Sequence, residues 1–174
     1  MMYSIVRAVG IIALVLISTV IFISQKTLLN FPYNQIHVIF IILTFLLFFA
    51  PLSASMWYSV IVAFILELYA LTPFGVLTFA LVASAIIGHM VFQRFLTNFS
   101  FISLATTLLI ILVSNRVILL FLSVLVSGTF ADVSLFFELV HVSWEFVMST
   151  GVLFLVYFLV RHFYRLARPE YVRR

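Results

Sequence analysis

Long apolar runs separated by short polar breaks account for most of this chain of 174 residues. A membrane-spanning helix needs about 20 predominantly apolar residues. Six segments meet or approach that length, namely residues 5–24, 36–51, 54–71, 74–92, 99–120 and 144–162. The pattern therefore predicts an all-α integral membrane protein with six transmembrane helices. They would form one compact bundle, a single transmembrane domain over residues 1–174.

Proline marks two of the breaks between these segments. Pro51 follows Ala50 at the end of the second segment, and Pro73 follows Thr72 at the end of the third. Because proline disfavours helical geometry in the residue before it, both positions predict hairpins between neighbouring helices.

Composition supports the membrane assignment. The chain is 66% hydrophobic and 8% charged, with a mean hydropathy of +1.36. Soluble domains carry roughly 25% charged residues, so a water-soluble fold of this composition would lack a polar surface. The absence of cysteine excludes disulfides, thiolate metal sites and a cysteine nucleophile.

The charges indicate an orientation. Five of the nine basic residues lie between Arg161 and Arg174, and a basic tail over 163–174 favours anionic lipid headgroups at the cytoplasmic face over nucleic acid. Six spans put both termini on that side, together with Arg7 and Arg94, and leave Lys26 outside. The expected location is a bacterial plasma (inner) membrane.

Glu67 is the one acid well inside the predicted spans, near the outer end of the third. Arg116, with Asn115 beside it, lies at a similar predicted depth in the fifth. Because an ionised group in a membrane usually faces the bundle interior and finds a partner, we expect a contact between Glu67 and Arg116. A proton- or substrate-handling acid is the alternative, and a structural pair is favoured over it.

Small residues in the fourth span predict close helix packing. Ala80, Ser84 and Gly88 recur at a spacing of four, which lets another helix approach closely. A ligand cavity at this face is the less favoured alternative.

A polar stripe precedes the sixth span. Ser134, Glu138, His141 and Glu145 recur at helical spacing. We expect an external amphipathic helix over 133–143, capped by Asp132, with Phe136 and Phe137 facing lipid or a partner protein. Glu138 and His141 match half of a di-iron signature, but no second Glu-x-x-His exists, so no metal site is predicted.

Other signatures of catalysis are missing from the sequence. There is no Gly-rich phosphate loop, no His-Glu-x-x-His and no Gly-x-Ser-x-Gly. The expectation is a protein that is not an enzyme, with no catalytic residues and no cofactor.

Several of these segments resemble the MreD family of the bacterial rod-shape system. The family typically shows Gly-x-x-x-Asp, a short turn and a glycine that opens the next helix. This chain has Ala63, Glu67, the Thr72-Pro73 turn and Gly75 in those places, and so departs from the family at Ala63 and Glu67. Residues 30–34, the Ala50-Pro51 hairpin, Gly88 with Arg94, and the arginine-rich end also fit.

The resemblance, over residues 28–168, implies a non-enzymatic scaffold of the elongation complex (elongasome), involved in cell shape and peptidoglycan synthesis. Such a scaffold would bind a bitopic MreC-like protein and, through the complex, MreB, RodA and its transpeptidase. Partner contacts are expected at Phe136, Phe137, Glu138 and His141. Structural or assembly roles are expected for Glu67, Arg116, Asn115, Pro73, Gly75, Ala80, Ser84 and Gly88.

The resemblance also implies a fold like the substrate-binding subunits of energy-coupling-factor transporters. This supplies an alternative function, a vitamin-binding subunit with a ligand enclosed beneath its external loops. A membrane enzyme or lipid flippase that uses Glu67 to handle protons is a third possibility.

Overall fold

A computed structural model describes the backbone of residues 2–30, 33–70, 73–95, 100–127 and 135–167. Within these ranges the chain is helical and has no strand. The elements are α1 (Met2–Leu28), the 3₁₀ turn η1 (Tyr33–Gln35), α2 (Val38–Phe49), α3 (Leu52–Glu67), α4 (Val76–Phe95), α5 (Phe101–Ser127) and α6 (Leu135–Ala167).

Four of the described helices are long and apolar enough to cross a membrane, which indicates a membrane protein. These stretches are Val9–Leu28, Val76–Arg94, Phe101–Leu125 and Val140–His162. The second and third predicted spans are shorter than expected. At 1.5 Å per residue, α2 and α3 rise about 18 and 24 Å, less than the roughly 30 Å of a bilayer's hydrocarbon core.

The two proline-containing breaks shorten these helices. Ala50 adopts an extended conformation (φ −117°, ψ 155°) before Pro51, which confirms the predicted hairpin between α2 and α3. The break between α3 and α4 is longer than predicted, because α3 already ends at Glu67 and α4 begins only at Val76.

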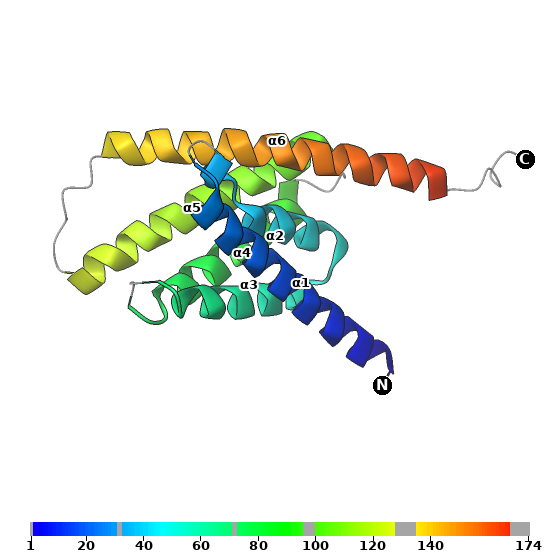
Figure 1. The fold of residues 1–174 in the computed structure, drawn as a ribbon, viewed down its shortest axis with the longest axis horizontal. Coiled ribbons are helices and arrows are strands. Elements are labelled where there is room, and N and C mark those ends of the chain that lie inside the picture. Colours follow the sequence, from blue (N-terminus) through cyan, green and yellow to red (C-terminus); the bar gives the residue numbers. More distant parts are fainter. Residues whose placement is uncertain (1, 31–32, 71–72, 96–99, 128–134, 168–174) are drawn as a thin grey trace, which may run out of the picture.

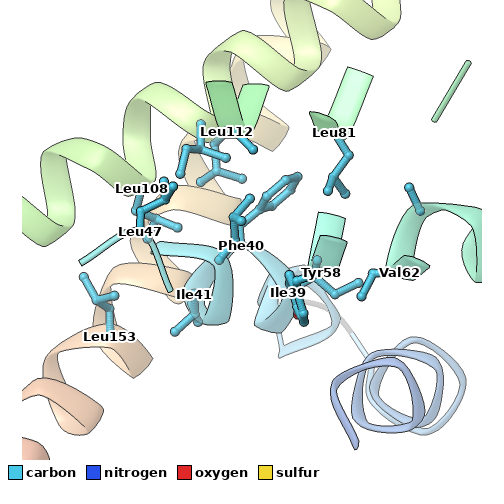
Figure 2. Packing of buried hydrophobic residues seen from close by; sticks show 14 of the residues in the cluster. Ile39, Phe40, Ile41, Leu47, Tyr58, Val62, Leu81, Leu108, Leu112 and Leu153 are labelled. Carbon is cyan, nitrogen blue, oxygen red and sulfur yellow. The ribbon is translucent and has the colours of Figure 1, made fainter. Parts of the chain in front are cut away.

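Helix α2 lies at the centre of the bundle. Its sequence is apolar on every side, and it contacts each of the other five helices. A helix that is hydrophobic all round belongs in an interior. Figure 2 shows Phe40 between Leu108 and Leu112 of α5 on one side and Tyr58 of α3 on the other. The central position of α2 explains how a helix of 12 residues can organise the core.

Helix α6 is longer than predicted. It runs without a break from Leu135 to Ala167, so residues 135–143 are its first turns and not a separate amphipathic helix. Asp132, the predicted cap, lies outside the described residues. The 33 residues of α6 give a rod of about 50 Å.

The connections alternate between the two ends of the molecule (Figure 1). The start of α1, the loop between α2 and α3 and the end of α6 lie at one end of the long axis. The turn between α3 and α4, the end of α5 and the start of α6 lie at the opposite end. The last turns of α1, the start of α2 and the facing parts of α5 and α6 come together around the buried polar residues Gln25, Glu145 and Ser149.

Candidate functional site

Glu67, the last residue of α3, is satisfied by the first turn of α4. Its carboxylate accepts the backbone N–H of Thr78 at Oε1 (2.9 Å) and the Thr78 hydroxyl at Oε2 (3.0 Å). The side chain is buried, with 5% of its surface exposed. An acceptor at this position caps a helix, because the first N–H groups of a helix have no partner within it. Glu67 therefore joins α3 to α4.

The turn before α4 explains why the cap comes from another helix. Gly75, directly before the first residue of α4, has φ +95° and carries no side chain that could accept a hydrogen bond. That backbone conformation is readily available only to glycine. Pro73 lies in the same turn, and its carbonyl oxygen accepts the N–H of Val76 (3.4 Å). The carboxylate of Glu67 thus replaces the usual capping side chain.

Arg116 pairs with Glu145, and the predicted contact between Arg116 and Glu67 is wrong. A guanidinium nitrogen of Arg116 on α5 donates to Oε1 of Glu145 on α6. Glu145 is almost completely enclosed, with 2% of its surface exposed. The sequence favours Glu67 because it is the one acid well inside the predicted spans, whereas Glu145 belongs to the polar stripe before the sixth span.

His37 extends this pair towards α2. Its Nε2 lies 3.2 Å from Oε1 of Glu145, and its backbone N–H donates to the hydroxyl of Ser149 (2.9 Å). Glu145, Ser149 and Leu153 recur at a spacing of four on α6, and all three are buried. Residues at this spacing share one face of a helix. The buried face of α6 is therefore polar where it meets the start of α2 and apolar further along.

The last turns of α1 complete the group of polar residues. Gln25 is buried, and its Nε2 donates to the carbonyl oxygen of Ile36 (2.9 Å). The ammonium group of Lys26 lies 5.6 Å from the centre of the Phe22 ring. The charges of Glu145 and Arg116 both act on Lys26. Lys26, His37, Arg116 and Glu145 are called the charged cluster below.

The imidazole of His37 is the neutral member of the charged cluster. His37 lies in the connection between α1 and α2, outside the four helices of spanning length. Burial lowers its pKa below the ordinary value near 6.5, although the Glu145 carboxylate acts in the opposite direction. At pH 7 the charged cluster therefore holds two cations and one anion.

The small residues of α4 lie at a closely packed interface. Ala80 and Ser84 are fully buried. A methyl group added at Gly88 would lie 2.7 Å from Cγ1 of Ile111 on α5 and 3.4 Å from Cδ1 of Leu47 on α2. These positions let α4 approach α5 and α2 closely, as the spacing predicted.

The other residues predicted for the site either lie apart from the charged cluster or have side chains that the structure does not describe. Asn115 is buried, and its Oδ1 has no hydrogen-bond partner among the described residues. His141 is exposed at the start of α6. The side chains of Phe136, Phe137 and Glu138 lie outside what the structure describes. No group of three or more metal-ligating side chains occurs among the described residues.

Sequence reasoning missed two members of the charged cluster. His37 is not among the residues that the sequence singles out, and Glu145 is expected only as part of the polar stripe that precedes the sixth span. One signal was present in the sequence, because Glu145, Ser149 and Leu153 form a row that continues into the apolar part of the helix. A row that leads from an acid into a hydrophobic stretch indicates a buried face.

A shallow apolar groove lies on α6 next to the charged cluster. It is lined by Val140, Ser143, Trp144 and Val147. Val140, Trp144 and Val147 are exposed, with 40%, 40% and 58% of their surfaces accessible. The groove is open on one side and presents a face that lipid or another helix can cover.

Comparisons of this chain with protein-family models, curated proteins and solved structures found no match.

Proposed function

We propose that the protein is a non-enzymatic membrane scaffold of the bacterial cell-elongation complex, acting in cell shape and peptidoglycan synthesis by binding an MreC-like bitopic protein. In this proposal the chain resides in the plasma (inner) membrane with both termini in the cytoplasm. Helices α2 and α3 also cross the bilayer, within a locally thinned membrane. MreB, RodA and its transpeptidase belong to the same assembly.

The geometry of one hairpin carries this proposal. Ala63, Glu67, Pro73 and Gly75, which resemble the MreD motif, all lie in the connection between α3 and α4 or in the helix leading to it. Ala63 is fully buried, Glu67 caps α4 and Gly75 supplies the left-handed turn. In this hairpin the acid is an architectural element, which supports a scaffold over a proton-handling enzyme.

A docking surface for the partner is available on α6. The groove at Val140, Trp144 and Val147 is apolar and exposed, and it begins about one helical turn after the predicted contact residues Phe136 and Phe137 in the sequence of α6. A bitopic partner presents a single apolar helix in the same membrane. Such a helix fits an open groove between side chains, because helix association in membranes depends on close packing.

Co-purification with the MreC-like protein of the same organism tests the proposal. The wild-type chain is expected to retain the partner in detergent, and the double variant V140S/V147S to lose most of it. The matched control L155S/L159S changes two exposed apolar residues elsewhere on α6 and should retain the partner. Phe136→Ser with Phe137→Ser extends the test towards the start of the helix.

A second arm measures cell shape. Depletion of the protein should turn rods into spheres, and complementation with V140S/V147S should fail while L155S/L159S succeeds. Wild-type protein that purifies without an MreC-like partner but with a bound vitamin would overturn the scaffold in favour of a ligand-binding subunit. Turnover lost in Glu67→Gln would instead point to an enzyme.

A further inference from the structure

Arg116 is only partly enclosed, although it lies within a membrane-spanning stretch. Its side chain is 33% exposed, whereas that of its partner Glu145 is 3% exposed. Arg116 lies nine residues before Leu125, the end of the apolar stretch of α5, which corresponds to about 14 Å along the helix. A guanidinium exposed at this depth needs a polar or charged group beside it, because hydrocarbon cannot solvate it.

The protein satisfies only part of the hydrogen-bonding capacity of Arg116. A guanidinium carries five N–H donors in a planar fork. Within the described part of the chain, Arg116 makes one hydrogen bond, from one nitrogen to Oε1 of Glu145. The side chain of Arg116 is also the more exposed of the two. Its remaining donors have no acceptor among the described residues of the chain.

The described charges of the cluster are not balanced. Lys26 and Arg116 contribute two positive charges, Glu145 contributes one negative charge, and His37 is neutral. The described groups therefore leave one positive charge in excess. Glu145 and Arg116 also act electrostatically on Lys26. An uncompensated charge in a region of low dielectric constant is costly, and an anion with several oxygens would remove that cost.

Lys26 places this excess charge near the end of a span. It is exposed and lies two residues before Leu28, at the end of the apolar stretch of α1. The ammonium group can therefore reach the headgroup region. Arg116 lies deeper, and its long side chain can extend towards the same interface. Phosphate suits such a pair, because a guanidinium binds its oxygens with two parallel N–H bonds and a lysine supplies a point charge.

We propose that Arg116 and Lys26 form a binding site for the phosphate group of an anionic phospholipid from the membrane leaflet at this end of the bundle. The lipid phosphate accepts hydrogen bonds from the free donors of Arg116 and neutralises the excess charge. Glu145, which His37 contacts from the start of α2, holds Arg116 from the protein side. The acyl chains lie against exposed apolar residues of α5, among them Val117 and Phe121.

Native mass spectrometry of the purified, delipidated protein tests the site directly. Phosphatidylglycerol, phosphatidylcholine and diacylglycerol are added back, and the apparent Kd of each is measured. Phosphatidylglycerol should bind tightest, since the other two carry either a compensating cation or no phosphate. Lys26→Gln should weaken phosphatidylglycerol binding about fivefold, the effect of one basic residue near an anionic surface.

Two further variants separate binding from folding. Arg116→Gln strands Glu145 and can unfold the protein, so the double variant R116Q/E145Q removes the pair as neutral amides. It should weaken phosphatidylglycerol binding at least as much as Lys26→Gln. The matched control Arg94→Gln changes an exposed arginine of α4 outside the charged cluster and should leave the Kd unchanged.

Three outcomes would overturn the proposal. The first is equal affinity for the three lipids, which would show that only acyl chains are bound. The second is unchanged phosphatidylglycerol binding in both Lys26→Gln and R116Q/E145Q. The third is a loss confined to co-purification of a partner protein in these variants, which would make the external anion a carboxylate of that partner. The lipid measurement uses the isolated chain, so its failure does not affect the scaffold proposal.

Discussion

Glu67 and Thr78 hold the α3–α4 hairpin together through two hydrogen bonds that join the last residue of one helix to the third residue of the next. The acid at first looks anomalous in an apolar stretch, but it has a structural partner only eleven positions along the chain. Glu67 caps α4 because Gly75, directly before that helix, adopts the backbone conformation that the turn needs but has no side-chain oxygen to accept a hydrogen bond.

Removal of this cap should destabilise the protein. Glu67→Ala should lower the free energy of unfolding by about 1–2 kcal/mol, the usual effect of losing a helix cap. Glu67→Gln should lower it by less, because the amide oxygen can still accept one of the two hydrogen bonds. Reversible unfolding in mixed detergent micelles measures the change. Thr78→Val serves as the complementary variant, and its effect should not add to that of Glu67→Ala, since both remove the same contact.

Loss of one member of the Arg116–Glu145 pair should be more damaging than loss of both. Arg116→Gln should destabilise the protein by about 3 kcal/mol, because it leaves Glu145 buried without its counter-charge. The double variant R116Q/E145Q should recover a large part of that stability. Monodisperse yield in detergent and unfolding free energy provide the measurement. Recovery in E67Q/R116Q and not in R116Q/E145Q would contradict the pairing.

The packing of α4 against α5 predicts opposite effects at two glycines. Gly88→Ala should destabilise the protein by about 1–3 kcal/mol, because the new methyl group overlaps the fully buried Ile111. Gly151→Ala is the matched control, since a methyl group there would have no neighbour within 4 Å. It should stabilise α6 by about 0.5–1 kcal/mol through backbone entropy. Similar unfolding free energies for both variants would argue against close packing at Gly88.

The hydroxyl of Ser149 should be needed to satisfy the backbone before α2. Ser149→Ala removes the acceptor of the His37 N–H, and the unpaired group should cost about 1–3 kcal/mol. Ser123→Ala is the comparison, because the hydroxyl of Ser123 is exposed and bonds a carbonyl of its own helix, Leu120. That change should alter the unfolding free energy by less than about 0.5 kcal/mol. Hydrogen exchange at the start of α2 reports the same difference locally.

Helix positions followed closely from hydrophobicity, whereas the partners of the charges did not. Apolar runs and Pro51 predicted where α2 and α3 separate, because backbone geometry around proline is a local property. Pairing in the bundle depends on which faces of distant helices meet. Arg116 lies 29 residues from Glu145, and no local pattern determines that these two side chains face each other.

Periodicity along the sequence did not predict which residues of α6 are buried. His141 and Glu145 lie one turn apart in the predicted polar stripe, yet His141 is exposed and Glu145 is enclosed. Glu145 is enclosed where it meets His37 and Arg116. A change of environment along one straight helix cannot be derived from periodicity alone.

The order in which the pair is synthesised has a consequence for biogenesis. Arg116 leaves the ribosome 29 residues before Glu145, so α5 enters the membrane with its cation while the matching anion has not yet been made. At about 5–20 residues per second, this interval lasts roughly 1.5–6 s. During that time the nascent chain must hold an unpaired arginine in the translocon or at its lipid boundary, and α6 completes the charge balance only when it is inserted.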